Sequence, residues 1–301
     1  MSKKILIICG ATGSGKSSLA IEVAKKLNTE IISADSLAIY KELDIGTAKP
    51  TKEEQSIVKH HLIDVVSPFE TFSVSDYESL ALPIIDKLLS ENKTPIICGG
   101  TGFYINSILY KLSYGGIPEN LEVRNKFFEL SKTEGVEAVH NELKKVDEES
   151  AKKLHPNDLV RVIRALEIYY GTGKKKSEQQ DKLIPRYDYT AVTINHDREV
   201  LYSRINKRVD IMLENGLINE VKGLIDKGVT IDNQCMQGIG YKEVYDAIIN
   251  DNFDNLKDLL KLNSRHYAKR QITFFKKLEN LQYLNGNLEE LTNKTIELLN
   301  K

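Results

Sequence analysis

The 301-residue sequence has almost no excess of charge and no long apolar run. Lysine and arginine number 42 against 43 acidic residues, a formal net charge of −1, so no overall field draws nucleic acid to the protein. A nucleic-acid site would have to come from local basic patches. No apolar run approaches the length of a membrane span, and no signal peptide precedes the first predicted strand. We therefore expect no membrane partner.

Cysteine is also scarce. The three cysteines, Cys9, Cys98 and Cys235, lie far apart and lack the spacing of metal ligands. Two of them end predicted buried strands, so we interpret them as buried free thiols. Free thiols suit a reducing compartment, and we expect a cytoplasmic protein. Hydrophobic residues make up 41% of the sequence, enough for the core of one large domain or two modest ones.

A glycine-rich loop near the N-terminus is the strongest motif. Five apolar residues at 5–9 predict a buried parallel strand, and apolar residues at helical spacing from Leu19 to Leu27 predict a helix. The loop between them fits G-x-x-x-x-G-K-S and consists of Gly10, Ala11, Thr12, Gly13, Ser14, Gly15, Lys16 and Ser17. Its amides would surround a di- or triphosphate, with Lys16 as the cation and Ser17 as a Mg²⁺ ligand. Alone, this loop suggests a kinase or an NTPase.

Strands and helices alternate through the first hundred residues. Further strands are predicted at 30–36, 60–66 and 94–98, and helices at 77–89 and 103–109. This alternation predicts a parallel, doubly wound α/β sheet. Ligands of such sheets bind outside the carboxyl ends of the strands, so the loops at these ends should converge on one cleft.

The pattern then changes. Residues 121–170 predict helices only, residues 189–194 predict a fifth strand, and the chain from Arg198 onward is predicted to be helical. We therefore expect two domains, a core of residues 1–116 and 187–301 and an inserted all-helical subdomain of residues 117–186.

Two residues at strand ends are candidates for catalysis. Asp35 follows the second strand, where its carboxylate can either deprotonate a nucleophile or simply cap a turn or orient Mg²⁺. Both interpretations stay open. Thr101 lies in a second glycine-rich turn, Gly99-Gly100-Thr101-Gly102. Two such turns at adjacent strand ends favour a Thr101 that binds a leaving oxygen or a phosphate over an ordinary turn residue.

Basic residues cluster on two predicted helices after the fourth strand. Arg161 and Arg164 lie one turn apart, where they can grip phosphates or pair with Asp158 and Glu167. Both interpretations stay open. The second cluster consists of Arg204, Lys207 and Arg208. A solvated helix face is the usual explanation for such a cluster, unless the helix starts near the phosphate cleft.

A third basic cluster spans residues 264–277, with five lysines and arginines, one histidine and no acidic residue. On a helix, Arg265 and Lys269 fall in one stripe with Arg270 beside it, and Tyr267 falls on the apolar back. A helix of this kind suits a nucleic-acid backbone.

Over nearly its whole length the sequence resembles the tRNA dimethylallyltransferases (tRNA isopentenyl transferases) of bacterial type. The matching motifs are GATGSGKS at 10–17, ADSLAIYKELDIGTAKP at 34–50, HHLIDV at 60–65, FSVSDY at 72–77, GGTGFYI at 99–105, HPNDLVRVIRALEIY at 155–169, MLENGLINEV at 212–221, QGIGYKE at 237–243 and RHYAKRQITFFKK at 265–277. The DIGTAKP and GGTG segments are specific to this family and its adenylate-prenylating relatives.

The resemblance implies a P-loop NTPase-like parallel sheet flanked by helices, with an inserted all-helical subdomain and a helical C-terminal region. It also changes the role of the loop, which in this family holds the diphosphate of dimethylallyl diphosphate with Mg²⁺. The dimethylallyl group moves to the exocyclic amine of the adenosine 3′-adjacent to the tRNA anticodon, and diphosphate is released. The base is flipped out of the anticodon loop to reach the donor. The implied partner is the tRNA anticodon stem-loop, bound by a monomer.

The family's roles fall on matching residues of this chain. The resemblance implies that Asp35 accepts a proton from the attacking amine, Thr101 contacts the leaving diphosphate and Arg208 helps to neutralise it. The implied tRNA contacts are Asp35, Ser36, Leu37, Ala38, Thr101, Arg124, Val160, Arg161, Val162, Ile163, Arg164, Arg265, Lys269 and Arg270. Ala38 departs from the family, which commonly has glutamine there, so adenine selection would rest on other contacts.

Two other functions are compatible with the phosphate-binding loop, a prenyltransferase that acts on free adenylate and a small-molecule kinase. The long helical insert and the basic C-terminal helix favour a tRNA substrate, because a nucleotide or a small molecule needs neither.

Overall fold

The computed structural model describes residues 4–179 and 184–301. The chain divides into two compact units, which we call the core unit (1–109 and 185–301) and the insert (110–184). The insert begins seven residues and ends two residues before the subdomain expected from the sequence. Within the described ranges, no helix is both long and apolar enough to cross a membrane.

The core unit is built on a six-stranded sheet. Its strands are β1 Lys4–Cys9, β2 Ile31–Ala34, β3 His60–His61, β4 Ile96–Gly99, β5 Asp188–Ile194 and β6 Gln282–Leu284. They are ordered β3-β2-β4-β1-β5-β6, and every pairing is parallel. The prediction of a parallel α/β sheet is confirmed. The carboxyl ends of the strands lie at one edge of the sheet. The loops that were expected to converge begin there, after β1, β2 and β4.

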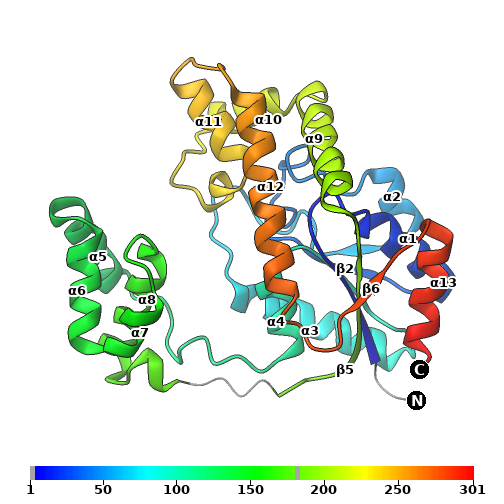
Figure 1. The fold of residues 1–301 in the computed structure, drawn as a ribbon, viewed down its shortest axis with the longest axis horizontal. Helices are drawn as coiled ribbons and strands as arrows, with labels where there is room; N and C mark the ends of the chain where they lie inside the picture. Colours follow the sequence, from blue (N-terminus) through cyan, green and yellow to red (C-terminus); the bar gives the residue numbers. More distant parts are fainter. Residues whose placement is uncertain (1–3, 180–183) are drawn as a thin grey trace. The chain divides into compact units, whose positions relative to one another are not determined.

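Helices cover both faces of this sheet (Figure 1). Those of the core unit are α1 Lys16–Leu27, α2 Lys52–Ile57, α3 Val74–Ser90, α4 Gly102–Leu109, α9 Arg198–Glu214, α10 Leu217–Asp226, α11 Tyr241–Ile249, α12 Leu256–Phe275 and α13 Leu288–Leu299. Leu19 and Val23 of α1 and Leu291 of α13 bury against Leu6 and Ile8 of β1. The apolar run that predicted β1 is buried along its length, because helices pack on both sides of it.

Two predictions of secondary structure differ from the structure, one strand being shorter than expected and one strand having been missed. The strand expected at 60–66 stops at His61, because Leu62 and Asp64 have φ values of 61° and 56°, outside the extended range. The region after Arg198 is not wholly helical, since Gln282–Leu284 forms β6. These residues pair with β5 from Val192 to Ile194, and only Leu284 is buried. A strand so short and exposed carries no periodic signal of its own.

The insert is all-helical, as expected. Its helices are α5 Leu121–Glu134, α6 Val136–Val146, α7 Glu148–Lys153 and α8 Leu159–Thr172. They enclose a separate core around Phe127, Val139, Leu143, Val162 and Leu166. The apolar spacing of α8 therefore packs the insert itself.

A buried carboxylate ties the insert together. Glu167 of α8 is fully buried and accepts hydrogen bonds from the Asn120 backbone N–H (2.5 Å), from Arg164 Nη1 (2.5 Å) and from Arg124 Nε (3.1 Å). Burial alone would raise the pKa of Glu167, but these donors outweigh it and hold the pKa below its usual 4.5. Arg164 Nη2 also donates to the carbonyls of Tyr114 and Ile117. The network connects α5, α8 and the start of the insert.

Replacement of Glu167 by glutamine is expected to destabilise the insert by about 3 kcal/mol, because it removes the counter-charge of Arg164 and one of the two acidic partners of Arg124, which keeps Glu119. The contribution of Glu167 is full at neutral pH and is lost as the pH falls through its lowered pKa, below the usual 4.5. Hydrogen exchange of the α8 amides between pH 3 and 7 measures both effects. Glu129→Gln is the matched control, since its pair with Lys132 is exposed and should contribute under about 1 kcal/mol. Equal effects of the two substitutions would contradict this role.

Candidate active site

The glycine-rich loop connects β1 to α1, as predicted. Gly13 and Gly15 have φ values of 76° and 92°, a left-handed conformation that glycine adopts at no steric cost. The α1 helix begins at Lys16, so its unpaired N-terminal amides face the loop. Lys16 Nζ folds back and donates to the Ala11 carbonyl at 3.3 Å. The loop thus has the amide-lined form that binds phosphate groups.

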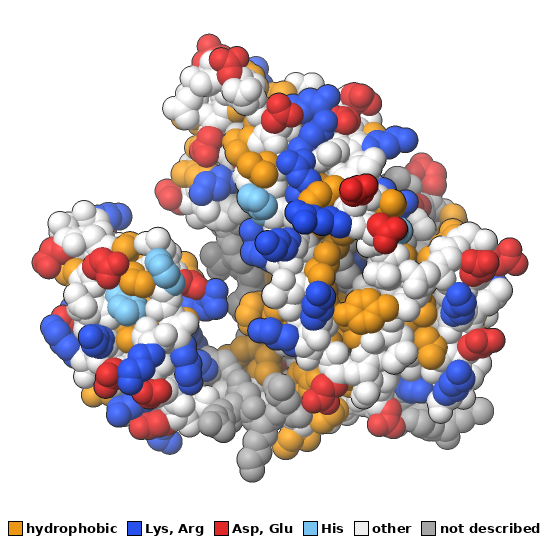
Figure 2. All heavy atoms as spheres, viewed as in Figure 1, with side chains coloured by type: hydrophobic (Ala, Val, Ile, Leu, Met, Phe, Trp, Pro, Cys, Tyr) orange, Lys and Arg blue, Asp and Glu red, His pale blue; other side chains and the backbone are white. Residues whose placement is uncertain are grey.

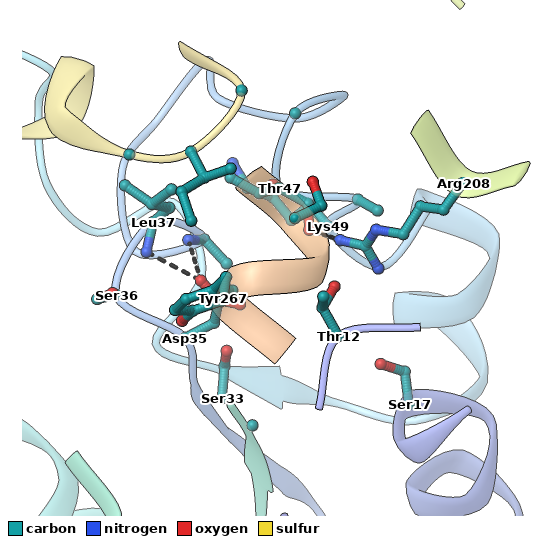
Figure 3. A pocket seen from close by; sticks show the side chains of 18 of the residues that line it. Thr12, Ser17, Ser33, Asp35, Ser36, Leu37, Thr47, Lys49, Arg208 and Tyr267 are labelled. Carbon is teal, nitrogen blue, oxygen red and sulfur yellow. Dashed lines mark hydrogen bonds between the residues drawn. The ribbon is translucent and has the colours of Figure 1, made fainter. Parts of the chain in front are cut away.

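A cavity of about 410 Å³ opens beside this loop. It is lined by Thr12, Lys16 and Ser17 of the loop, by Asp35 after β2 and by Arg208 of α9, which Figure 3 shows around one space, apart from Lys16. The volume is that of a small-molecule site. The loops after β1 and β2 converge on this cavity as predicted, whereas Gly99 at the end of β4 lines it and Thr101 does not. The α9 helix adds a cation that the sheet pattern did not place.

Two cations face the cavity without an acidic partner. Neither Lys16 nor Arg208 forms an ion pair with a residue of the described ranges, and Arg208 Nη2 donates to the Thr47 carbonyl at 2.8 Å. Burial lowers the pKa of Lys16, and the nearby charge of Arg208 lowers it further. Burial also lowers the pKa of Arg208, while the charge of Asp35 opposes this shift. The charge of Asp35 also acts on Lys16, but two close cations share this one carboxylate and neither forms an ion pair with it, which favours an anionic ligand between them.

Asp35 stands at the carboxyl end of β2, in the same cavity. Its Oδ1 accepts the backbone N–H groups of Leu37 (2.9 Å) and Ala38 (3.2 Å), drawn as dashed lines in Figure 3. The turn-capping interpretation of Asp35 is therefore correct for this oxygen. No hydrogen bond within the described residues uses Oδ2, so the same carboxylate retains an acceptor for a bound amine. Ser36, Leu37 and Ala38 also line the cavity.

Thr101 belongs to the turn after β4 and contacts the Asp35 turn. Its Oγ1 accepts the Ser36 N–H at 3.0 Å and donates to Ser36 Oγ at 3.3 Å. Its own N–H donates to the Ala34 carbonyl at 3.0 Å. These hydrogen bonds place the Thr101 hydroxyl with the Asp35 turn, while its predicted contact with a diphosphate oxygen stays a prediction.

Tyr267 is a cavity residue that the sequence pattern did not reveal. Its spacing assigned it to the apolar back of a surface helix, but it lines the cavity and lies beside Asp35 in Figure 3. Burial, with the charge of Asp35, raises its pKa to about 12, so the phenol is neutral and can donate a hydrogen bond. The residues of α12 that line the cavity are Leu260, Ser264, Tyr267, Arg270 and Gln271. Their helical spacing was the available signal, and it was interpreted as a packing face.

The basic face of α12 is present with one change. The helix ends at Phe275, so Lys276 and Lys277 lie beyond it. Lys269 and Arg270 are exposed, whereas Arg265 is half-buried and donates to Asn206 Oδ1 at 2.7 Å. Figure 2 shows lysine and arginine side chains gathered along α12 with few acidic ones among them.

The predicted RNA contacts in the insert divide into three groups. Val162 and Ile163 have 0% and 1% of their surface exposed, so their side chains pack the core of the insert and are not available to RNA. Arg124 and Arg164 are engaged with Glu167. Only Val160 and Arg161 project into solvent, 70% and 71% exposed, and Arg161 pairs with Asp158 at 2.5 Å. Both ion pairs that the sequence left as an alternative are present.

A single carboxylate holds the loop after Asp35. Glu220 of α10 accepts the N–H groups of Asp44 (2.9 Å), Ile45 (2.7 Å) and Gly46 (3.1 Å), together with the hydroxyl of Tyr241 (2.6 Å). A Cβ on Gly46 would lie 2.6 Å from the Tyr241 ring, so glycine is required there. This loop continues into Thr47, whose carbonyl orients Arg208.

Glu220→Gln is expected to loosen this loop, because an NH₂ group would replace an oxygen that accepts two of these hydrogen bonds. Loss of hydrogen bonds to a charged acceptor should cost about 1.5–3 kcal/mol for each bond. Hydrogen exchange of the amides of residues 44–46 is the measurement. Tyr241→Phe is the graded control, since it removes one of the four donors. Unchanged protection in Glu220→Gln would show that the backbone holds the loop without the carboxylate.

Mg²⁺ has one candidate protein ligand. Ser17 is exposed at the start of α1 and faces the cavity. Across residues 4–179 and 184–301, no group of three or more histidine, cysteine, aspartate or glutamate side chains is placed to hold a metal. A single hydroxyl fits Mg²⁺, because this ion keeps several waters and takes its other ligands from a bound phosphate.

The matches to known proteins agree with this geometry. Residues 38–278 match the model of the family described as IPP transferase. A protein of Acetivibrio thermocellus named tRNA dimethylallyltransferase is 47% identical over 98% of this chain and 96% of its own length. A protein of the same name from Thermoanaerobacter sp. is 44% identical over 99% of this chain and 98% of its own length.

Solved structures give the same result. The full-length tRNA isopentenylpyrophosphate transferase of Bacillus halodurans superposes with a TM-score of 0.74 at 39% identity, covering 99% of this chain and 97% of its own. A eukaryotic dimethylallyltransferase, described as acting on tRNA, superposes with a TM-score of 0.81 at 32% identity, covering 94% of this chain and 74% of its own. With its loop, its cavity and these full-length matches, the chain belongs to the IPP transferase family, together with the tRNA dimethylallyltransferases.

Proposed function

We propose that this protein transfers a dimethylallyl group from dimethylallyl diphosphate to the exocyclic amine of the adenosine 3′-adjacent to a tRNA anticodon, and releases diphosphate. One observation carries the proposal. Lys16 and Arg208 face a single cavity without forming an ion pair with a described residue, and the carboxylate of Asp35 stands in that cavity with a free acceptor oxygen. A diphosphate supplies the missing negative charge, and an attacking amine supplies a proton for the carboxylate.

The reaction exchanges one bond at the allylic carbon. The amine nitrogen forms a bond to C1 of the dimethylallyl group while the bond from C1 to the diphosphate oxygen breaks. The bonding pair leaves with the diphosphate, whose growing charge Lys16, Arg208 and the loop amides stabilise. The nitrogen loses a proton to Asp35. Since an allylic carbon with such a leaving group needs little activation of the nucleophile, stabilisation of the leaving group should contribute more to the rate than the base does.

Mg²⁺ is proposed as the cofactor, with Ser17 as its protein ligand. The ion would shield the charge of the diphosphate. Ser17 lies at the N-terminus of α1, next to Lys16, so the ion and the helix amides would act on the same phosphate groups.

The tRNA partner is supported by the family and by the basic face of α12. Lys269 and Arg270 lie on the helix that also places Tyr267 in the cavity. If the phosphate backbone of the tRNA anticodon stem bound along α12, the anticodon loop would lie near Asp35, the proposed acceptor of the amine proton. Binding as a monomer and a cytoplasmic location remain predictions.

The test is mass spectrometry of tRNA nucleosides after incubation with dimethylallyl diphosphate and Mg²⁺. An unmodified tRNA with adenosine 3′ of the anticodon should gain the dimethylallyl group, whereas the same tRNA with guanosine there should not. Prenylation of AMP but not of tRNA would favour the free-adenylate enzyme. ATP that displaces dimethylallyl diphosphate and donates a phosphoryl group would favour a kinase. Absence of any prenylated adenosine would refute the proposal.

A further inference from the structure

Gln271 is a buried polar side chain on α12, the helix whose exposed face is basic. It lies on α12 with 5% of its surface exposed, directly after the exposed Lys269 and Arg270. A buried carboxamide is stable only when its donor and its acceptor are both hydrogen-bonded. The partners of Gln271 therefore show what this residue holds.

Both ends of the carboxamide bind backbone groups of the active-site loops. Oε1 accepts the N–H of Thr12 at 2.8 Å, and Nε2 donates to the carbonyl of Gly100 at 3.0 Å. The orientation of the amide is unambiguous, because a backbone N–H can only donate and a backbone carbonyl can only accept. One side chain thus joins the loop after β1 to the turn after β4, two neighbouring strands of the sheet.

The turn after β4 is shaped to receive α12. A Cβ on Gly100 would lie 2.1 Å from Gln271 Nε2, and a Cβ on Gly102 would lie 2.2 Å from the ring of Phe274. A side chain at Gly100 would displace the carboxamide of Gln271, and one at Gly102 would displace the ring of Phe274. The glycines of the GGTG segment therefore allow the close approach that the Gln271 hydrogen bonds require.

The two loops held by Gln271 serve opposite ends of the reaction. The phosphate-binding loop carries Lys16 and the backbone amides that would face the diphosphate. The second carries Thr101, whose hydroxyl binds Ser36 and so supports the Asp35 turn. A relative shift of these loops would change the distance between the leaving group and the acceptor base, on which the rate of transfer depends steeply.

We propose that Gln271 is a positioning residue that locks the phosphate-binding loop and the GGTG turn into one unit, so that donor and acceptor meet in register. The proposal rests on the function proposed above. Gln271 touches no reacting atom and moves no proton. It also holds the N–H of Thr12 away from the phosphate groups, leaving the later amides of the loop to bind them.

Two variants test this role. Gln271→Met keeps the length of the side chain and loses both hydrogen bonds. We expect its affinity for pyrophosphate to fall about tenfold and kcat to fall about ten- to a hundredfold, with tRNA affinity unchanged. Gln271→Glu keeps the acceptor for Thr12 but turns an anion toward the Gly100 carbonyl. A protonated carboxyl again offers one donor and one acceptor, so its activity relative to wild type should rise as the pH falls. Gln271→Met should show no such rise.

Gln234→Met gives the stability reference, because Gln234 also donates and accepts one hydrogen bond each, both with the backbone of Phe72. The thermal midpoint of Gln271→Met should fall at least as far as that of Gln234→Met, because Gln271 is buried whereas Gln234 is exposed. Wild-type pyrophosphate affinity and kcat in folded Gln271→Met would overturn the proposal. So would a parallel loss of tRNA affinity, which a general loosening of α12 would cause. If wild-type protein prenylates no tRNA, the proposed function fails, while the pyrophosphate measurement still reports on Gln271.

Discussion

Lys16→Met is expected to lower kcat/KM for dimethylallyl diphosphate about a hundred- to thousandfold, the usual effect of removing one charged contact to a developing anion. Lys16 lies at the start of α1, where its charge and the helix amides would act on the same phosphate groups of the proposed donor. Single-turnover prenylation of tRNA and titration with pyrophosphate are the measurements. Lys25→Met is the matched control, because Lys25 lies on the same helix and pairs with Glu22 at the surface.

The same substitution should leave the ligand-free protein as stable as wild type, or more stable. Burial and the charge of Arg208 lower the pKa of Lys16, so its charged form opposes folding, and an apolar side chain removes this cost. If Lys16→Met has a lower thermal midpoint than wild type, its loss of activity would be explained by reduced stability and not by the loss of the cation.

The lowered pKa also sets a pH dependence. Since the charged lysine binds diphosphate, affinity should fall as the pH rises through this pKa, below the range of an ordinary lysine. The methionine variant should lack this fall.

Asp35→Asn is expected to lower kcat about a hundredfold, near the lower end of the range for a general base, because an allylic donor needs little activation of the amine. Asparagine keeps an oxygen for the N–H groups of Leu37 and Ala38, so the turn after β2 should persist. The substitution therefore separates the two roles that the sequence left open. Loss of kcat with unchanged tRNA binding assigns proton acceptance to the carboxylate.

Asp35→Ala removes both roles and should reduce kcat further. Asp226→Asn, an exposed carboxylate on α10, controls for the loss of one negative charge. If Asp35→Asn turns over within about threefold of wild type, the carboxylate only caps its turn and the proton passes to water.

The sequence predicted those parts whose signals are local. The five apolar residues before Gly10, the glycines of the loop and the helical spacing after Lys16 lie within one segment, so the strand, the loop and the helix could be predicted together. The cleft followed from topology, because parallel strands place their carboxyl ends at one edge. The helical character of residues 121–170 followed from their sequence pattern, though not the number or bounds of the helices.

Local signals failed where a distant partner decides the conformation. The residues from Val192 to Ile194 and from Gln282 to Leu284 form a strand pair, yet the second segment has no strand pattern of its own. The left-handed residues Leu62 and Asp64 end β3 although the sequence there looks like a strand. Val162 and Ile163 are a different case, since the family resemblance assigned them to RNA and the structure buries their side chains in the core of the insert.

The sequence by itself determined the parallel sheet, the phosphate-binding loop, the helical insert and the family. Only the tertiary structure decided how the site is assembled: it places Tyr267 beside Asp35 (Figure 3), Arg208 at the cavity without an ion-pair partner among the described residues, and Gln271 between Thr12 and Gly100. Gln271 lies 259 residues along the chain from Thr12 and 171 residues from Gly100. The physical reason is that contacts over such separations exist only once the whole core has packed, and then one face of α12 serves the cavity and the other the solvent.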